Sequence, residues 1–311
     1  MKKIKLGINA VRIKSGGGVS HVKGILEAYN PNIFSFTKIH LWCNNSISKQ
    51  LWNYPWLKIY VPNVSNKSTL RQLYWERFTF KKILKSLDID ILFNVDAGSI
   101  CDFSPAVTLS QDMLSYEPGE IKRYGISKER LRLIILRYVQ NNSLKNSTSA
   151  IFLTKYGANL VQKSSGKISK YQVIPHGIDD IFKEDKPKAL NAKDDRIKIL
   201  YVSNTAPYKH QWHVVKAIKF LIKKYPRLKL ELVGGGSGKA QKKLIRSLNI
   251  YDPQMEFTTI IDNQPKDKIA DLMRNCDIFL FASSCESISI TLLEAMASKV
   301  PIACSNRGPL P

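Results

Sequence analysis

Short apolar runs alternate with amphipathic helical patterns along most of this chain. In the first half, strands are expected at residues 5–9, 39–43, 58–61, 89–94, 106–109 and 150–154. Between these runs, apolar residues recur at helical spacing, as at Val19, Val22 and Leu26, which predicts helices. Regular alternation of strands and helices is typical of an α/β layer fold with a parallel sheet.

A second unit of the same kind follows a polar interval. Residues 179–196 are rich in charge, include Pro187 and lack apolar periodicity, so a linker is expected there. Further strands are expected at residues 197–202, 229–233, 278–282 and 300–304, and near residues 255–258. The pattern therefore predicts two α/β domains, at residues 1–178 and 197–311, joined by a linker at residues 179–196.

Composition narrows the class of protein. The 311 residues are 44% hydrophobic and 23% charged, which is ordinary for a soluble protein of about two domains. No apolar run reaches the roughly 20 residues of a membrane-spanning helix, and the basic start leads into a strand, so a cytoplasmic location is expected. The five cysteines are scattered and lack the close pairs of a zinc or redox site, so reduced thiols are expected.

The formal net charge of +23 calls for an acidic partner: nucleic acid, an anionic membrane or a phosphorylated substrate. Basic residues outnumber acidic ones by 26 to 12 in residues 1–180 and by 22 to 13 in residues 181–311, so the excess forms no single tail. Two segments mix bases with apolar residues and suit contact with anionic lipid at the inner face of the cytoplasmic membrane. In the alternative, these apolar residues belong to the core and the bases face solvent. The bases are Lys81, Lys82 and Lys85 after residues 73–78, and Arg130, Arg132 and Arg137 around residues 131–139.

Candidate chemistry concentrates near the end of the chain. The strand at 278–282, a helix beginning near Ser289 or Ile290 and the strand at 300–304 predict a parallel crossover, and ligands bind beyond the carboxyl ends of such strands. The start of the helix presents unpaired amides and the positive end of its dipole, which suit a diphosphate. The residues assigned to this anion site are Ser287, Ile288, Ser289 and Ile290.

Two glutamates accompany this helix, Glu286 before it and Glu294 within it. A carboxylate accepts several hydrogen bonds and donates none, which suits vicinal hydroxyl groups. We therefore assign Glu294 to a ribose and Glu286 to a sugar hydroxyl, and the hypothesised ligand is a nucleotide sugar. In the alternative interpretation, Glu286 caps the helix and Glu294 is a solvated helical residue.

Two loops of the second domain complete the predicted site. Lys209 stands between the strand at 197–202 and a predicted helix, where its ammonium group would neutralise a diphosphate; a solvated lysine is the alternative. The glycine-rich stretch at 234–239 fails as a P-loop and as a dinucleotide fingerprint. A close-packed turn lining a nucleotide pocket is expected there, with Gly234 and Gly236.

The order of these features resembles the retaining glycosyltransferases of family 4, which have the GT-B fold. Glu286, seven residues, Glu294, an Ala-Met-Ala sequence, a strand led by Pro301 and an Asn-Arg-Gly sequence follow one another as in that family. The likeness extends to the segments at 16–18, 151–155, 173–179, 201–209 and 230–236. It implies two Rossmann-like doubly wound domains facing a cleft, with the acceptor side at 1–178, the donor side at 197–311, and the second domain incomplete.

The resemblance also implies an activity. A sugar would pass, with retention at the anomeric carbon, from a nucleotide-sugar donor to a saccharide or lipid-linked saccharide in the synthesis of cell-surface polysaccharide or lipopolysaccharide. No cofactor and no metal are expected, and no nucleic acid. Glu286, Lys209 and Asp112 are the implied catalytic residues.

The remaining donor-site positions carried by the resemblance are Gly17 and Gly18, in the loop expected at residues 10–18 before the first helix, and Asn204. The sequence departs from the family at two places: Asn204 stands where many members carry an arginine, and Gln111 precedes Asp112 where many carry a histidine. For Asp112, a simple loop turn is the alternative.

Other functions are weighed against this one. A glycosidase pair is disfavoured, because eight residues of helix separate two carboxylates by about 12 Å, beyond the roughly 5 to 9.5 Å that hydrolysis uses. A basic nucleic-acid-binding protein remains an alternative permitted by charge, although no recognition module stands out. An inactive GT-B fragment acting as a partner is the other alternative.

Overall fold

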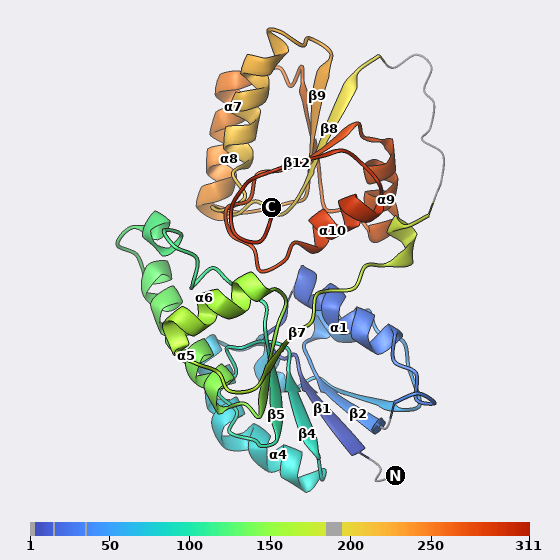
Figure 1. Cartoon of the computed structure of the whole chain (residues 1–311), viewed down its shortest axis with the longest axis vertical. Coiled ribbons are helices and arrows are strands. Elements are labelled where there is room, and N and C mark those ends of the chain that lie inside the picture. Colours follow the sequence, from blue (N-terminus) through green and yellow to red (C-terminus); the bar gives the residue numbers. More distant parts are fainter. Residues whose placement is uncertain (1–3, 15, 35, 185–194) are drawn as a thin grey trace. The chain divides into compact units, whose positions relative to one another are not determined.

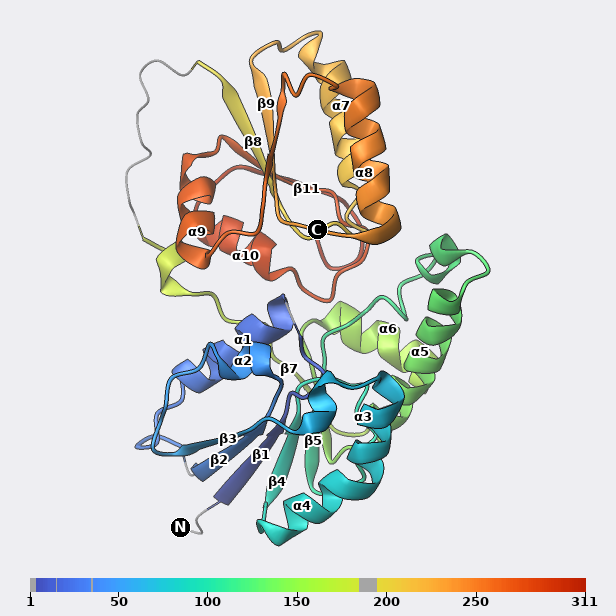
Figure 2. The ribbon, with the colours of Figure 1, turned by 180° about the vertical axis from the view of Figure 1, so that it is seen from behind.

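A computed structural model describes residues 4–14, 16–34, 36–184 and 195–311 of the chain. The chain divides into two compact units, Met1–Gly177 and Ile178–Pro311, and each is built around one parallel β-sheet (Figures 1 and 2). Most of the predicted linker, residues 185–194, lies outside the described residues.

The sheet of the first unit has the order β3-β2-β1-β4-β5-β6-β7, and every neighbouring pair is parallel. The chain builds outward from β1 to β3, then returns past β1 to β4 and continues to β7. The point at which the strand order reverses therefore lies between β1 and β4, which is where ligands bind in such sheets. The strands are β1 (Ile4–Asn9), β2 (Phe36–Trp42), β3 (Leu57–Tyr60), β4 (Ile91–Asn94), β5 (Ala106–Ser110), β6 (Ser149–Phe152) and β7 (Tyr171–Val173).

Helices cover both faces of this sheet. α1 and α2 lie on one face, and α3, α4, α5 and α6 lie on the other (Figures 1 and 2). Right-handed crossovers impose this division, because the two directions of the strand order send helices to opposite faces. The helices are α1 (Gly17–Glu27), α2 (Asn45–Ser48), α3 (Thr69–Trp75), α4 (Lys81–Ser86), α5 (Lys128–Asn146) and α6 (Lys155–Ser165), with short turns η1 (Asn63–Asn66), η2 (Glu76–Phe80) and η3 (Ile121–Tyr124).

Local sequence sets several of these boundaries. α5 begins after Ser127, whose Oγ accepts a hydrogen bond from the Arg130 N–H (3.2 Å), and α6 begins after Thr154, which caps the Gly157 N–H (3.0 Å). α6 ends at Ser165 and is followed by Gly166, whose φ of 78° suits glycine.

The sheet of the second unit has the order β10-β9-β8-β11-β12 and is also parallel throughout. Its strand order reverses between β8 and β11. The strands are β8 (Ile197–Val202), β9 (Leu228–Val233), β10 (Thr258–Ile261), β11 (Ile278–Phe281) and β12 (Ile302–Cys304). The helices are η4 (Asp180–Phe182), α7 (Gln211–Ile222), α8 (Gly238–Tyr251), α9 (Lys266–Asn275) and α10 (Ile290–Ala297).

Aromatic side chains fill the centre of the second unit. Tyr201, Phe279 and Phe281 are each 1% exposed or less, and the rings of Tyr201 and Phe281 meet edge to face at 5.7 Å. Phe182, from within the predicted linker, is also 1% exposed and belongs to this core. The described start of that linker is therefore packed as part of the second unit.

Most of the expected strands are confirmed, and three expectations are wrong in detail. The strand expected near residues 255–258 begins only at Thr258, because the Asp252 carboxylate accepts hydrogen bonds from the N–H groups of residues 256–258 and holds them in a turn. β7 was not expected at all. Gly17 and Gly18 form the first turn of α1 instead of a loop, because the chain already reverses at Gly16, with a φ of 68°.

In the part of the chain that the structure describes, none of the helices combines the length and apolar character that crossing a membrane requires.

Candidate functional site

A buried ion pair stands at the switch point of the second unit. β8 and β11 are neighbours in the sheet, so the loops that follow them lie side by side and bring Lys209 and Glu286 together. The Lys209 Nζ atom is 2.5 Å from the Glu286 Oε1 atom, and their side chains are only 10% and 13% exposed. The Ser283 hydroxyl donates a second hydrogen bond, also 2.5 Å long, to the same oxygen.

Lys209 is held by the strand beneath it. The Tyr201 hydroxyl of β8 donates a hydrogen bond to the Lys209 carbonyl oxygen. The ammonium group lies 4.7 Å from the centre of the Phe281 ring of β11 and 5.4 Å from that of Tyr208. These aromatic faces favour a cation at this point, so its position is fixed before any ligand arrives.

The two loops are also joined through Ser284. Its N–H donates to the Tyr208 carbonyl oxygen (2.9 Å), and its hydroxyl lies 2.8 Å from the His210 Nε2 atom. His210 has a φ of 57° and immediately precedes α7, so the loop enters that helix through a left-handed turn. Lys209 therefore stands next to the start of a helix, as the sequence predicts.

The helix expected after Glu286 is α10, and it begins at Ile290 as predicted. Ser289 is its N-cap, and the Ser289 hydroxyl accepts a hydrogen bond from the Leu292 N–H (3.2 Å). Ser287 and Ser289 are buried, whereas Ile288 and Ile290 are partly exposed. The other N–H groups of the first turn have no intrahelical acceptor, which makes this end of the helix suited to an anion.

The glycine turn after β9 is packed against the loop after β8. A Cβ atom at Gly234, where φ is 121°, would come within 2.3 Å of the Ser203 carbonyl oxygen. One at Gly236 would come within 2.4 Å of the Thr205 Cβ atom. The Thr205 N–H donates to the Gly235 carbonyl oxygen (3.1 Å), which fastens the two loops together. The predicted close packing is therefore present, and the role of the turn in a nucleotide pocket stays a prediction.

Asn204 lies on the same loop and is exposed. Its carbonyl oxygen accepts hydrogen bonds from the Gln211 side-chain amide (2.9 Å) and from the Ser203 hydroxyl (3.0 Å). Gln211 is 3% exposed, so a buried side chain anchors the backbone of the exposed residue Asn204.

Glu294 lies in the second turn of α10 and is partly buried. Burial raises the pKa of Glu294 to about 7; the positive charge of Lys266 lowers this pKa, and the negative charge of Asp179 raises it further. Lys266 itself pairs with Asp179 at 3.0 Å. Glu294 is therefore not the solvated helical residue of the alternative interpretation, and its role toward a ribose stays a prediction.

The candidates of the first unit stand in different surroundings. Asp112 is exposed, and its Oδ1 atom accepts a hydrogen bond from the Leu114 N–H (2.9 Å), which is the loop turn of the alternative interpretation. The Gln111 side-chain amide donates to the Val95 carbonyl oxygen (3.0 Å). Gly17 and Gly18, as described above, open α1.

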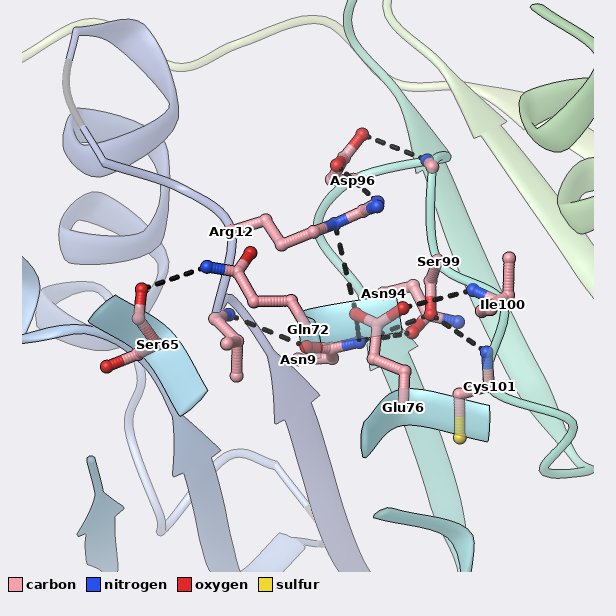
Figure 3. A network of polar contacts seen from close by, with 12 residues as sticks. Asn9, Arg12, Ser65, Gln72, Glu76, Asn94, Asp96, Ser99, Ile100 and Cys101 are labelled. Atoms are coloured by element: carbon pink, nitrogen blue, oxygen red, sulfur yellow. Dashed lines mark hydrogen bonds and ion pairs between the residues drawn. The ribbon is translucent and has the colours of Figure 1, made fainter. Parts of the chain in front are cut away.

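Sequence reasoning missed a polar network at the switch point of the first unit (Figure 3). Arg12, in the loop after β1, donates to the Asp96 carboxylate at 2.7 Å, and Asp96 follows β4. The Arg12 Nε atom lies 3.9 Å from the Glu76 carboxylate, which is 1% exposed. Burial disfavours the charged guanidinium, but the carboxylates of Asp96 and Glu76 outweigh it and raise the pKa of Arg12.

Backbone and amide groups complete this network. Glu76 accepts hydrogen bonds from the Asn9 side chain (3.2 Å) and from the Ile100 N–H (3.1 Å). Asn9 also donates to Asn94 and to Ser99, each at 3.2 Å. Even so, burial raises the pKa of Glu76. The signal available in the sequence was a set of polar residues directly after two predicted strands.

A pair of histidines joins the start of α1 to the end of the first unit. The Nδ1 atoms of His21 and His176 are 3.0 Å apart, and burial lowers the pKa of each to about 4. At neutral pH both rings are therefore uncharged, and one nitrogen donates to the other.

Comparison with known proteins identifies the second unit. Residues 182–311 match the family described as "Glycosyl transferases group 1". The chain is 27% identical over 176 residues to protein CapJ of Staphylococcus aureus, covering 56% of this chain and 42% of CapJ. It is 24% identical over 269 residues to the poly(glycerol-phosphate) alpha-glucosyltransferase of Bacillus subtilis, covering 85% of this chain and 37% of that protein. The chain thus spans about two fifths of the length of these relatives.

Solved structures share the fold of the whole described chain. The sucrose-phosphate synthase of Thermosynechococcus elongatus aligns with a TM-score of 0.76 and 16% identity over 99% of this chain and 82% of that chain. HepE of Anabaena in complex with UDP-glucose aligns with a TM-score of 0.73 and 17% identity, over 98% of this chain and 81% of that chain. WaaG, a glycosyltransferase involved in lipopolysaccharide biosynthesis, aligns with a TM-score of 0.70 and 14% identity, over 99% of this chain and 82% of that chain. The chain therefore has the α/β architecture of the GT-B structures, and its residues 182–311 match the glycosyl transferases group 1 family.

Proposed function

We propose that this protein is a retaining glycosyltransferase that moves a sugar from a nucleotide-sugar donor to a saccharide or lipid-linked saccharide. The observation that carries the proposal is the buried pair of Lys209 and Glu286 at the β8/β11 switch point, close to the start of α10 in sequence. Replacing a buried ion pair by apolar residues is often neutral or stabilising, so stability alone does not explain this pair.

On the donor side, each group has a chemical task. The amides at the start of α10 and the Lys209 ammonium would bind the diphosphate, whose negative charge grows as it leaves. Glu286 would accept hydrogen bonds from sugar hydroxyls while it orients Lys209. Glu294 would accept them from the ribose, and the glycine turn at residues 234–236 would let the nucleotide approach the backbone closely.

The reaction conserves the configuration of the transferred sugar. The acceptor hydroxyl attacks the anomeric carbon on the face from which the diphosphate departs. The bond from that carbon to the diphosphate oxygen breaks as the new glycosidic bond forms, and a phosphate oxygen of the leaving group takes the hydroxyl proton. The protein supplies orientation and charge stabilisation, and Asp112 would border the sugar or the acceptor.

We expect no metal in this reaction, because Lys209 and the helix amides would supply the positive charge that a divalent ion supplies elsewhere. Among the described residues, no group of three or more His, Cys, Asp or Glu side chains is arranged to hold an ion.

We also propose that the first unit contacts the cytoplasmic face of an anionic membrane, and the support is a set of exposed apolar side chains. On α5, the exposed side chains follow the spacing of one helix face, while Leu133 and Leu144 are buried on the other. The alternative in which the apolar residues of this segment belong to the core is therefore wrong for the exposed ones, although it holds for Leu133. The first unit carries two such exposed apolar patches, which we together call the lipid-facing surface: Leu70, Tyr74 and Phe78 on α3 and η2, and Leu131, Ile134, Ile135 and Tyr138 on α5, each between 42% and 78% exposed.

Positive charge borders the lipid-facing surface. Residues 69–86 hold five bases and one acid, and residues 122–146 hold seven bases and one acid. Apolar side chains on a helix bordered by Lys and Arg suit the headgroup region of an anionic bilayer, where a lipid-linked acceptor would be met. Nucleic acid offers no comparable partner for the aliphatic side chains of α5.

Ligand-induced stabilisation tests the donor side directly. We expect one nucleoside diphosphate, and its sugar conjugate, to raise the melting temperature, because a ligand at about 100 times its dissociation constant adds roughly 2.7 kcal/mol to stability. Lys209→Ala and Glu286→Ala should lose this shift and the transfer of sugar. A salt-sensitive complex with RNA or DNA without any nucleotide-sugar effect would favour the nucleic-acid alternative. A folded protein that no donor stabilises would favour the inactive scaffold.

A further inference from the structure

The two switch points of this protein carry the same arrangement of a base and an acid. In the second unit, Lys209 follows β8 and Glu286 follows the neighbouring strand β11. In the first unit, Arg12 follows β1 and Asp96 follows the neighbouring strand β4 (Figure 3). Each base donates to its acid, at 2.5 Å and 2.7 Å respectively. The proposed function gives the pair of the second unit a ligand and leaves the pair of the first unit without one.

The acid of the first pair is the more open of the two. The side chain of Asp96 is 28% exposed, against 13% for Glu286, while the Arg12 side chain beneath it is 13% exposed. The Asp96 Oδ2 atom accepts from Arg12, and Oδ1 accepts from the Gly98 N–H at 3.0 Å. A carboxylate has about four lone-pair sites, so about two remain for a ligand.

The base of this pair is held rigidly from below. Glu76, which is 1% exposed, lies 3.9 Å from the Arg12 Nε atom and is itself fixed by Asn9 and by the Ile100 N–H. Arg12 also packs directly on the backbone: a Cβ atom at Gly98 would come within 2.4 Å of the Arg12 Nη2 atom. Such a fixed guanidinium holds the Asp96 carboxylate in one orientation, which a binding site for hydroxyl groups requires.

We propose that Asp96, oriented by Arg12 and Glu76, binds hydroxyl groups of the saccharide acceptor. This inference rests on the proposed function and names the acceptor side of that reaction. The free lone pairs of the carboxylate accept hydrogen bonds from two vicinal hydroxyls, and the remaining N–H donors of Arg12 serve a ring or hydroxyl oxygen. Asp96 is a binding residue here, because the departing phosphate takes the proton of the attacking hydroxyl.

Saccharide binding by an Asp96 variant tests the proposal. The probes are free glucose, galactose and N-acetylglucosamine, and their binding to the full chain is measured by saturation-transfer NMR. Asp96→Asn should weaken binding of the recognised probe about tenfold or more, as expected for loss of a hydrogen bond to a charged group. The matched control is Asp102→Asn, because Asp102 also pairs with two bases, Arg77 at 3.1 Å and Lys81 at 3.0 Å, away from the switch point. This control should bind the probe like the unaltered protein.

Two further measurements separate recognition from a structural role. Asp96→Asn keeps the Glu76 carboxylate beside Arg12 and should stay fully folded at the temperature of the binding assay, and Asp96→Glu should recover part of the binding. The proposal is overturned if no probe gives a signal that depends on Asp96, or if the loss of binding follows a loss of stability. Binding of nucleoside diphosphate should be unchanged in Asp96→Asn. If the unaltered protein binds no nucleoside diphosphate while saccharide binding still depends on Asp96, the proposed function fails and this inference survives.

Discussion

Replacing Lys209 with methionine removes the cation from an ion pair that water scarcely reaches. The two charged atoms are 2.5 Å apart, and the side chains are 10% and 13% exposed. Loss of one partner of a fully buried pair costs about 3–5 kcal/mol, because the remaining charge is uncompensated. Here the Ser283 hydroxyl still donates to Glu286 and some water has access. We therefore expect a loss of about 2–3 kcal/mol in the free energy of unfolding of the second unit.

A double-mutant cycle isolates the pair itself. Glu286→Gln alone leaves a buried ammonium group, whereas Lys209→Met combined with Glu286→Gln leaves no unpaired charge. The combined variant should therefore be more stable than the sum of the single losses predicts, by about 1.5 kcal/mol or more. Lys243→Met is the control: it removes the same charge from an exposed position of the same unit, where the ammonium lies 5.2 Å from the Trp212 ring. It should cost less than about 0.5 kcal/mol.

Urea unfolding gives the stabilities, and hydrogen exchange of the β8 and β11 amides reports the second unit by itself, since a chain of two units need not unfold in one step. Transfer from the nucleotide sugar is measured on the same five proteins: the unaltered protein, the two single variants of the pair, the combined variant and Lys243→Met. Stability should return in the combined variant, and transfer should not, because the diphosphate would still lack its cation. The reasoning is refuted if Lys209→Met is as stable as Lys243→Met, or if the combined variant transfers sugar at the original rate.

Three other changes have expected outcomes. The folded-state pKa of Glu294, about 7, lies above its ordinary value of 4.5, so its carboxylate lowers stability increasingly as pH rises from about 4.5 and fully above about 7. Glu294→Gln should therefore be more stable than the original protein by roughly 3 kcal/mol at about pH 8 and equal to it near pH 4, as urea titrations would show. Gly234→Ala should lower the free energy of unfolding by about 2 kcal/mol or more, because φ is 121° and the new Cβ atom would meet the Ser203 backbone. Its control, Gly24→Ala, places a Cβ atom in open space on α1 and should be neutral or stabilising when the melting temperatures of the two variants are compared. Leu131→Ser with Ile135→Ser should reduce flotation with vesicles of phosphatidylglycerol and phosphatidylcholine about tenfold without changing donor binding, and undiminished flotation would exclude the lipid-facing surface.

Much of the fold could be predicted because its strands are buried on both faces. β11 reads as a continuous apolar run between polar residues, and β8 as an apolar run interrupted only by Lys198; both appear where the pattern places them. β7 was missed because Tyr171–Val173 is a short edge strand with exposed residues, which carries no such run. The start of β10 was placed too early because the carboxylate of Asp252 holds the preceding residues in a turn, a contact that apolar periodicity does not encode.

The candidate site divides in the same way. Glu286 and Lys209 were both chosen as candidates, each by its place after a strand and before a helix, but as separate ligands of a donor, a role that stays a prediction. That they pair directly depends on the adjacency of β8 and β11, which brings together residues 77 positions apart. The network of Arg12 and Glu76 depends likewise on tertiary packing of the helix after β3 against the sheet. The other carboxylate that pairs with Arg12 belongs to Asp96, which follows the correctly predicted strand β4. The information missing from the sequence was that β4 lies next to β1.

The cost of these buried charges argues that they serve a ligand. Apolar side chains of similar volume at positions 209 and 286 would pack against Phe281 and Tyr201 and would often give equal or greater stability. Instead, in each unit a cation and a carboxylate occupy the loops at the point where the strand order reverses, which is where a doubly wound sheet leaves room at its carboxyl edge. A pair that only fastened two loops would gain nothing from this location over any other. A pair that receives phosphate in one unit and hydroxyl groups in the other requires it, and the Asp96 and Lys209 variants test the two halves of that requirement independently.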